Sequence, residues 1–252
     1  MKNRLIKKRL ELNKGGDLLN WTHIYFDLDN TLYDHEQAFK ETIQHCAERM
    51  LKRKGASVPT VQWFSIFKLN CDHYWNNYES GQWSRETYQI NRYCRTNDYF
   101  HLPCSNEEAL AFQEEYQSKV ASFAKLYHDL ELLLTALYEN KITLGIITNG
   151  RTEIQMAKIK ALKIMKWIPR ENIYISEAVG MSKPEPDFLK YVMRGKGNFL
   201  YIGDTWDHDI KPAIEAGFDA IYFNSRNEDV EQSIISVPEV STYKELMSLL
   251  EL

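Results

Sequence analysis

The sequence has few cysteines, and they do not form a recognisable motif. Cys46, Cys71, Cys94 and Cys104 are far apart in a chain of 252 residues, and no two form a CxxC pair. This spacing excludes a zinc ribbon or a thioredoxin-like redox motif. A chain of this length builds a sufficient core without disulfides. We therefore expect reduced thiols and a cytoplasmic protein.

Long apolar runs and an excess of basic residues are also missing. No apolar run approaches the roughly 20 residues that a transmembrane helix requires. The 31 Lys and Arg residues are outnumbered by 35 Asp and Glu residues, which gives a formal net charge of -4. This balance argues against an extended surface for polymeric nucleic acid but leaves room for a local cationic pocket. We expect a soluble monomer or homodimer that binds neither membranes nor nucleic acid polymers.

The first twenty residues are basic but contain no uninterrupted apolar segment, so a secretory signal is not expected. We interpret residues 1–20 as a flexible basic tail. A sharper hypothesis concerns Lys14 to Asp17, because these four amino acids can be encoded by AAAGGAGGTGAT, which resembles a ribosome-binding sequence. On that hypothesis the native start lies near Leu18 or Leu19, and residues 1–17 are not part of the native protein.

Three short apolar runs each end at a cluster of polar residues, which is typical of buried strands bounded by turns. Segments with helical periodicity lie between them. The runs, with the clusters that follow, are Ile24 to Phe26 before Asp27 to Thr31, Ile142 to Ile147 before Thr148 to Gly150, and Phe199 to Ile202 before Gly203 and Asp204. The predicted helices are Leu130 to Glu139, Thr152 to Ala161, Asp187 to Met193, Ile210 to Glu215 and Tyr243 to Leu250.

Alternation of strands and helices predicts an α/β fold with a Rossmann-like parallel sheet. The polar clusters then share the carboxyl edge of the sheet, where such folds bind ligands. More than a hundred residues separate the first two strands, far more than one crossover needs. We assign residues 21–35 and 123–252 to an α/β core and residues 36–122 to an inserted helical domain. Most aromatic residues of the insert should pack its own core.

Two aspartates at the end of the first strand suggest a reaction. A carboxylate can attack phosphorus and form an acyl phosphate, which splits hydrolysis into two easier displacements. Asp27 fits this role. Asp29, two residues later in the same turn, is the natural general acid and base, since it can protonate the leaving oxygen and then activate water.

The segment Tyr25-Phe26-Asp27-Leu28-Asp29-Asn30-Thr31-Leu32 resembles the first signature, DxDxT, of the haloacid dehalogenase-like hydrolases. Three further matches follow in the order of that family, at Thr148-Asn149-Gly150, at Ser182-Lys183-Pro184 and at Gly203 to Asp209. The resemblance extends over residues 21 to 225.

The resemblance implies a role for each matching residue. Thr148 and Asn149 would bind the phosphoryl group, and Lys183 would neutralise both this group and the nucleophile. The Asp27 side chain, the Asp29 backbone carbonyl and Asp204 would bind Mg²⁺, which prefers hard oxygen ligands. Asp209 would bind the ion through water or orient Lys183.

The resemblance also implies a function. It predicts a Mg²⁺-dependent phosphatase that hydrolyses a small phosphomonoester through an aspartyl phosphate, with a nucleoside monophosphate or a sugar phosphate as substrate. The insert would be a helical cap, with Trp83 and Arg92 as specificity residues. A haloacid dehalogenase, a phosphonatase and a non-catalytic regulatory or interaction member stay open as alternatives. Asp29 argues against the dehalogenase, because a halide leaving group needs no acid.

Overall fold

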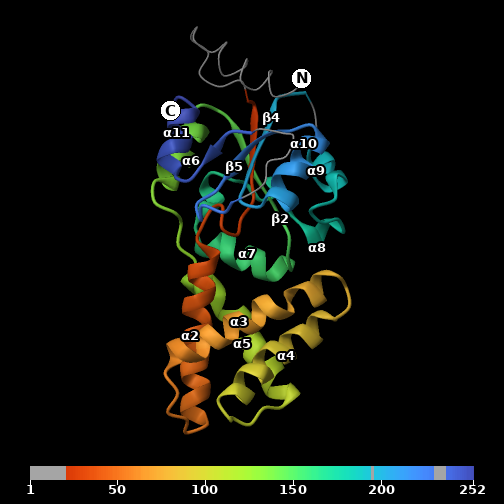
Figure 1. Cartoon of the computed structure of the whole chain (residues 1–252). Coiled ribbons are helices and arrows are strands. Elements are labelled where there is room, and N and C mark those ends of the chain that lie inside the picture. The colour runs from red at the N-terminus through yellow and green to blue at the C-terminus, as the bar shows by residue number, and fades with distance from the viewer. Residues whose placement is uncertain (1–20, 194–195, 230–236) are drawn as a thin grey trace. The chain divides into compact units, whose positions relative to one another are not determined.

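The computed structural model describes residues 21–193, 196–229 and 237–252. The predicted flexible tail over residues 1–20 lies outside these ranges. The chain divides into two compact units. The sheet unit comprises the described residues up to His35 together with Ala124–Leu252, and the helical unit is Glu36–Phe123. Figure 1 shows the sheet unit with its strands and the helical unit in orange and yellow.

The sheet unit contains a six-stranded parallel sheet with the order β3-β2-β1-β4-β5-β6. Its strands are β1 (His23–Phe26), β2 (Thr143–Thr148), β3 (Ile173–Ile175), β4 (Phe199–Gly203), β5 (Asp219–Phe223) and β6 (Glu239–Val240). The predicted α/β fold with a parallel sheet is confirmed. β1 lies between β2 and β4, so the three strands that precede polar clusters are neighbours.

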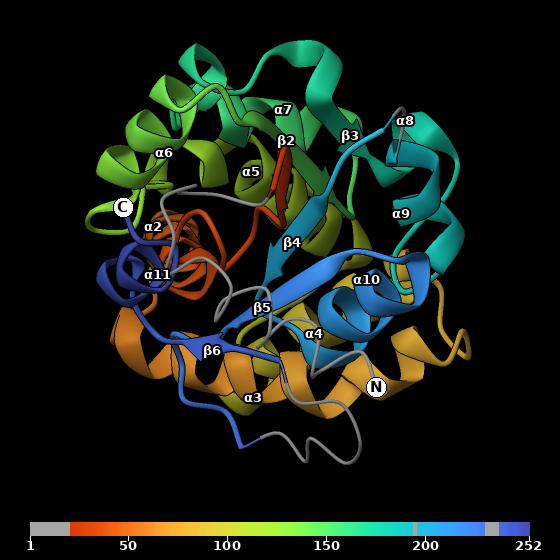
Figure 2. The same cartoon turned by 90° about the horizontal axis from the view of Figure 1, so that it is seen from above.

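Helices cover both faces of this sheet. Figure 2 shows α6 and α11 on one face and α9 and α10 on the other. The helices of the unit are α6 (Leu130–Glu139), α7 (Thr152–Ala161), α8 (Ser176–Val179), α9 (Pro186–Val192), α10 (Lys211–Ala216) and α11 (Tyr243–Leu249), with short turns η1 (Ile164–Lys166), η2 (Arg170–Asn172) and η3 (Trp206–Ile210). Tyr25, Phe188 and Tyr201 belong to a buried cluster between the sheet and α9 and α10.

Most predicted elements of the sheet unit are confirmed, with small shifts at their ends. α6 and α7 have the predicted bounds, and β2 begins and ends one residue later than predicted. The main difference is η3, a π-helical turn over Trp206–Ile210 that precedes α10. The helical periodicity of a sequence does not distinguish a π-helical turn from the α-helix that follows it. The turn depends instead on contacts that the polar residues of η3 make at the sheet edge.

The helical unit is built from four helices. They are α2 (His35–Arg53), whose first residue belongs to the sheet unit, α3 (Thr60–Glu79), α4 (Arg85–Tyr99) and α5 (Asn106–Phe123). Trp63, Phe67 and Tyr93 are buried with Phe112 in one cluster. The expectation that the aromatic residues pack the unit's own core therefore holds for these four, whereas Trp75 is 45% exposed.

Arg92 is also part of this interior. It is 8% exposed and donates to Gln113 Oε1 at 2.5 Å. Its guanidinium lies 4.8 Å from the centroid of the Tyr88 ring and 5.2 Å from that of Phe67. Trp83 stacks against Tyr74 with ring centroids 5.0 Å apart. Both predicted specificity residues thus have partners within the helical unit.

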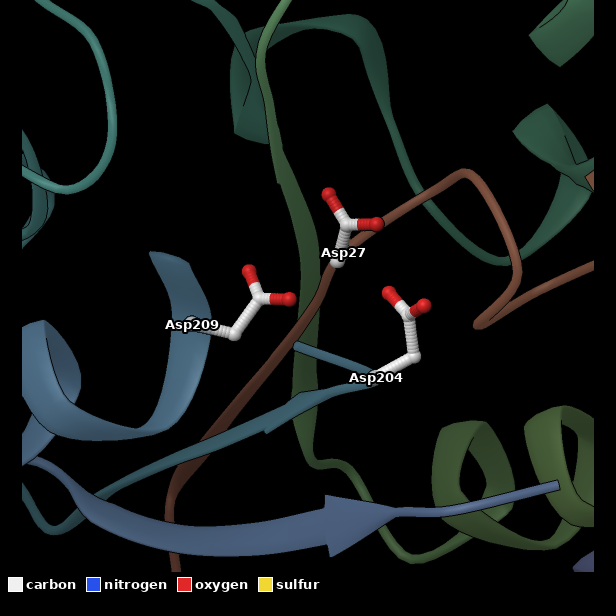
Figure 3. Close-up of side chains that lie close together, drawn as sticks. All are labelled: Asp27, Asp204 and Asp209. Atoms are coloured by element: carbon white, nitrogen blue, oxygen red, sulfur yellow. The ribbon is translucent and has the colours of Figure 1, made fainter. Parts of the chain in front are cut away.

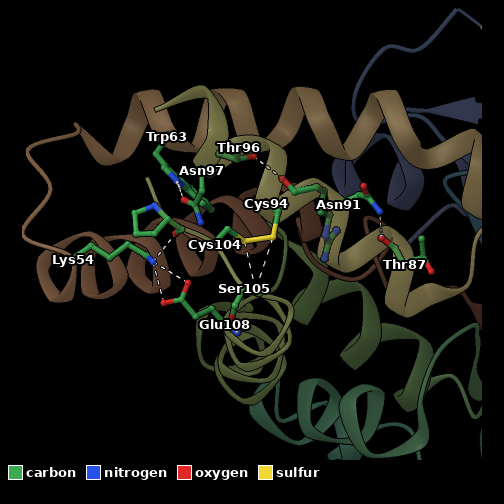
Figure 4. Close-up of a disulfide and its surroundings, with 12 residues drawn as sticks. Lys54, Trp63, Thr87, Asn91, Cys94, Thr96, Asn97, Cys104, Ser105 and Glu108 are labelled. Carbon is green, nitrogen blue, oxygen red and sulfur yellow. Dashed lines mark hydrogen bonds and ion pairs between the residues drawn. A yellow bond between two sulfur atoms is a disulfide. The ribbon is translucent and has the colours of Figure 1, made fainter. Parts of the chain in front are cut away.

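The expectation of four reduced thiols is wrong for one pair. Cys94 and Cys104 form a disulfide with a Cα–Cα distance of 5.5 Å (Figure 4), while Cys46 and Cys71 are free and buried. The turn between α4 and α5 brings the paired residues together across ten positions. Their spacing in the sequence does not reveal this, because it depends on where the two helices end.

Within the described residues, no helix combines the length and the apolar character required to span a lipid bilayer.

Candidate active site

Three buried carboxylates meet at the carboxyl ends of β1 and β4. Asp27 directly follows β1, Asp204 directly follows β4, and Asp209 lies in η3. One oxygen from each lies within 4.8 Å of the others, and Figure 3 shows the three side chains around a common space. Gly203 makes this approach possible, because a Cβ there would lie 2.5 Å from the Asp209 Cβ. The sheet therefore gathers residues that are far apart in the sequence.

Lys183 connects two of these carboxylates. Its ammonium lies 2.6 Å from Asp27 Oδ1 and 2.6 Å from Asp209 Oδ1. It also donates to the hydroxyl of Tyr201 at 3.0 Å, and this hydroxyl lies 3.0 Å from Asp209 Oδ1. The backbone N–H of Thr205 donates to Asp209 Oδ2 at 3.0 Å. Both oxygens of Asp209 are thus engaged, which suits a residue that orients Lys183.

Asn149 fixes the backbone of Lys183. The Asn149 amide nitrogen donates to the Lys183 carbonyl at 2.7 Å, and the Lys183 N–H donates to Asn149 Oδ1 at 2.9 Å. These reciprocal bonds join the end of β2 to the loop that carries Lys183. The Asn149 side chain therefore holds the lysine in place, and a phosphoryl contact of this residue would have to use its backbone.

The carboxylate of Asp29 lies in a separate set of contacts. Lys158 Nζ is 2.8 Å from Asp29 Oδ1 and 3.0 Å from Oδ2. The Gln155 amide nitrogen donates to Oδ2 at 3.0 Å. Tyr33 donates its hydroxyl to Oδ1, because the turn through Asn30, with a left-handed φ of 59°, brings the chain back beside Asp29.

Burial and charge act on these carboxylates in opposite directions. Burial raises the pKa of Asp27 well above its ordinary value, and Lys183 offsets this effect only in part. Burial likewise raises the pKa of Asp204 to about 7, with a further contribution from Asp209. For Asp29 burial also acts to raise the pKa, but Lys158 and His35 outweigh it and hold the pKa below its usual range. Asp29 is therefore the readily ionised member of the site.

The cluster contains three carboxylates, Asp27, Asp204 and Asp209, and the cations in contact with them are Lys183 and Arg226. When all three carboxylates are ionised, one negative charge is therefore left without a cation at ion-pair distance among the described residues. Lys183 engages one oxygen of Asp27, and Arg226 Nη2 lies 2.9 Å from Asp204 Oδ2. The second oxygen of each is left for another partner. Buried, hard oxygen donors with uncompensated charge are the ligand set that Mg²⁺ prefers. The donor set thus fits the predicted ion.

Several residues of this site are not predicted from the sequence. Arg226 follows β5 at the same sheet edge, so the strand pattern around Asp219–Phe223 could have indicated it. Gln155 and Lys158 lie in a predicted helix, where polar positions are normally assigned to solvent. Both are nevertheless buried. Their burial depends on Asp29 as a partner, which no periodicity reveals.

Comparison with known proteins now adds to this geometry. Residues 24–223 match the model of the family described as haloacid dehalogenase-like hydrolase. The chain belongs to this family. The match spans both units and includes every predicted site residue of this haloacid dehalogenase-like hydrolase.

Curated relatives are similar over nearly the whole chain. The chain is 24% identical over 237 residues to the pyrimidine 5'-nucleotidase YjjG of Escherichia coli (strain K12), covering 92% of this chain and 99% of the relative. It is 24% identical over 245 residues to a glyceraldehyde 3-phosphate phosphatase of Methanocaldococcus jannaschii, covering 90% and 96%. These relatives place the hydrolase in the phosphatase branch of the family.

A solved structure shares the fold. The HAD-hydrolase YfnB of Bacillus subtilis superposes with a TM-score of 0.78 at 20% identity, and the match covers 92% of this chain and all of that one. The YfnB structure is described as bound to magnesium, with a movement between domains. At this identity the likeness establishes the fold alone.

Proposed function

We propose that this hydrolase is a Mg²⁺-dependent phosphatase that cleaves a small phosphomonoester through an aspartyl phosphate on Asp27. The observation that carries the proposal is the contact of Lys183 with Asp27 and Asp209 beside Asp204. This arrangement pairs a carboxylate nucleophile with a fixed cation and a carboxylate cluster suited to Mg²⁺. The family resemblance assigns the same roles to the same positions.

In the proposed reaction, an oxygen of Asp27 bonds to phosphorus while the bond from phosphorus to the leaving oxygen breaks. Against the effect of burial, Lys158 and His35 hold the pKa of Asp29 low in the free protein, and a bound phosphate dianion beside Asp29 opposes this effect and favours uptake of a proton. Asp29 then gives this proton to the leaving oxygen. As a carboxylate, Asp29 then takes a proton from a water whose oxygen bonds to phosphorus, while the bond from phosphorus to Asp27 breaks and phosphate is released. Lys183 holds Asp27 and neutralises charge on the phosphoryl oxygens.

Mg²⁺, when bound, would reduce the repulsion between the anionic nucleophile and the anionic phosphate. Asp27 and Asp204 would hold it through their second oxygens, and the Asp29 backbone carbonyl is the third predicted ligand. Thr148, which is 1% exposed at the end of β2, would donate its hydroxyl to a phosphoryl oxygen.

The substrate class rests on the relatives. A pyrimidine nucleotidase and a glyceraldehyde 3-phosphate phosphatase are both similar to this chain, so a nucleoside monophosphate and a small sugar phosphate are the two substrate classes that we propose. Hydrolysis of a panel containing pyrimidine and purine monophosphates and triose to hexose phosphates, followed by phosphate release, distinguishes these classes. The preferred class is the one with the highest kcat/KM.

The decisive experiment is hydrolysis of 4-nitrophenyl phosphate with Mg²⁺. We expect activity that is lost in EDTA and in Asp27→Asn. Asp207→Asn is the matched control, because Asp207 is an exposed aspartate of η3 and should leave kcat within about twofold, as for most surface substitutions. An inactive wild type across the phosphate panel, or full activity in Asp27→Asn, contradicts the proposed mechanism. Turnover of a 2-haloacid would favour the dehalogenase alternative.

We retain a cytoplasmic location as a prediction, together with a monomer or homodimer. The disulfide between Cys94 and Cys104 weighs against the location, because such bonds are rare in reducing compartments. Alkylation of free thiols in freshly lysed cells, followed by mass spectrometry, shows which state these two residues have in the native host.

A further inference from the structure

Two side chains of α7 enclose the carboxylate of Asp29. Lys158 contacts both of its oxygens, and Gln155 contacts Oδ2. Gln155 and Lys158 are three positions apart, so they lie on the same face of the helix. They are 2% and 4% exposed, whereas Lys160 on the same helix is exposed. The face of α7 that points toward the site is therefore polar and buried.

Gln155 also joins Asp29 to Thr148. Its amide nitrogen lies 2.8 Å from Thr148 Oγ1 and 3.0 Å from Asp29 Oδ2, with the Asn149 carbonyl as a third acceptor at 3.1 Å. An amide nitrogen only donates, so Thr148 Oγ1 accepts this bond. The proton of Thr148 has the Asn149 carbonyl as its acceptor at a long 3.5 Å, from which a phosphoryl oxygen could take it over. A single nitrogen atom thus links the proposed acid and base to the proposed phosphate-binding hydroxyl.

We propose that Gln155 and Lys158 are positioning residues, which hold Asp29 beside the phosphate site and orient the Thr148 hydroxyl toward a phosphoryl oxygen. This inference rests on the proposed phosphatase function. Lys158 acts through Asp29 and not on the reacting atoms. The carboxylate of Asp29 is 27% exposed. Without Lys158 it would keep the hydrogen bonds from Tyr33 and Gln155. It would nevertheless be held less firmly, and proton transfer to the leaving oxygen would lose part of its geometry.

A purely structural role for this pair leads to a different expectation. The same contacts could serve only to fix α7 against β2, in which case a substitution would lower all activities by the same factor. A positioning role predicts selectivity in the formation of the aspartyl phosphate, since only a substrate with a poor leaving group depends on a proton from Asp29 in that step. The later attack of water uses Asp29 as a base whichever ester was cleaved. The dependence of kcat/KM, which reports the first step, on the leaving group therefore separates the two roles.

The test compares two esters in Mg²⁺. 4-Nitrophenyl phosphate has a leaving group that departs readily as an anion, whereas phenyl phosphate needs protonation. For Lys158→Met and Gln155→Met we expect kcat/KM on phenyl phosphate to fall by about 10²-fold, the size of a general-acid contribution. On 4-nitrophenyl phosphate the loss in kcat/KM should stay below about tenfold.

Three further variants and a control complete the experiment. Asp29→Asn should show the same selectivity, and adding Lys158→Met to it should cause little further loss. Lys158→Arg, which keeps the cation, should restore part of the activity on phenyl phosphate. Lys160→Met is the matched control on the exposed side of α7. If circular dichroism shows that Lys158→Met is unfolded, the test uses Gln155→Met and the same ratio of the losses on the two esters.

Equal losses on the two esters, or losses that add to those of Asp29→Asn, overturn the positioning role. When the wild type is active and Asp27→Asn is not, such a result overturns this inference alone. A wild type that cleaves neither ester overturns the proposed function, and the inference with it.

Discussion

Each unit of the molecule buries a cation, but the two cations have different surroundings. Lys183 in the sheet unit lies 2.6 Å from each of two buried carboxylates. Arg92 in the helical unit contacts the neutral Gln113 and the rings of Tyr88 and Phe67. Within the residues that the structure describes, Arg92 has no carboxylate at ion-pair distance.

This difference distinguishes a cation of a functional site from a cation that belongs to a hydrophobic core. Removing Lys183 would leave buried carboxylates without compensation, which is costly. Removing Arg92 would leave a neutral amide and two rings, which lose an attractive partner but carry no charge. A buried cation alone therefore does not identify a functional residue. The excess of opposite charge around it does, because an excess of carboxylates can bind a metal ion.

Lys183→Met tests this comparison with the largest expected effect. We expect kcat to fall by about 10²- to 10³-fold, because the fixed cation at the nucleophile is lost. Unfolding by urea in EDTA should show a loss of about 3–5 kcal/mol, the cost of breaking a buried ion pair by removing one partner. If Lys183→Met kept the urea midpoint of the wild type, the buried carboxylates would need no compensating cation. The contrast drawn here between Lys183 and Arg92 would then be wrong.

The disulfide gives the next largest effect, and it concerns the helical unit alone. Cys94→Ser combined with Cys104→Ser should destabilise this unit by about 3 kcal/mol, since the bond closes a short loop of the unfolded chain. Urea unfolding with and without dithiothreitol measures the loss. The control is the double variant itself, which should not respond to the reductant. A wild type that titrates four free thiols after unfolding without reductant would contradict the bond.

Arg92→Met tests the buried cation of the helical unit. Methionine keeps the aliphatic length, so the loss should be about 2 kcal/mol, from the hydrogen bond to Gln113, the longer ones to Tyr88 and Cys71, and the contacts with the rings. We expect kcat/KM for 4-nitrophenyl phosphate to stay within about threefold of wild type. A large loss of activity at unchanged stability would instead assign Arg92 to the site.

The smallest expected effect concerns His23, a titrating group of the sheet unit that does not belong to the carboxylate cluster. His23 begins β1 and stacks on Phe199 with ring centroids 4.5 Å apart. Burial lowers the pKa of His23 below 6.5, so the unfolded chain takes up its proton at a higher pH than the folded protein does. Stability is thus present above pH 6.5 and decreases as the pH falls below it.

Replacing His23 by Gln should remove this contribution. The difference in urea midpoint between wild type and His23→Gln is expected to shrink, or change sign, between pH 7.5 and pH 5.5. A difference that is independent of pH would contradict the shift. Any pH dependence that remains in His23→Gln then belongs to other groups, including the carboxylates at the site.

The sequence predicts the central part of this architecture because local patterns carry it. The strands before Asp27, Thr148 and Asp204 are short, apolar and bounded by turns, and a parallel sheet brings their ends to one edge. The remaining features depend on tertiary contacts. Gln155 is a polar residue of an ordinary helix until Asp29 and Thr148 are placed beside it, and the pairing of Cys94 depends on the path of a turn.

The two chain segments that lead to and from the helical unit lie side by side, and this affects how such a protein can evolve. The backbone N–H of Tyr127 donates to the Leu32 carbonyl at 3.3 Å, and Tyr33 forms a bridge with Leu126. The chain thus leaves the sheet unit and re-enters it at adjacent points. An insertion with neighbouring ends can be exchanged as a module, as in domain insertion. Recombination at these two positions would exchange the helical unit while Asp27 and its partners stay in place.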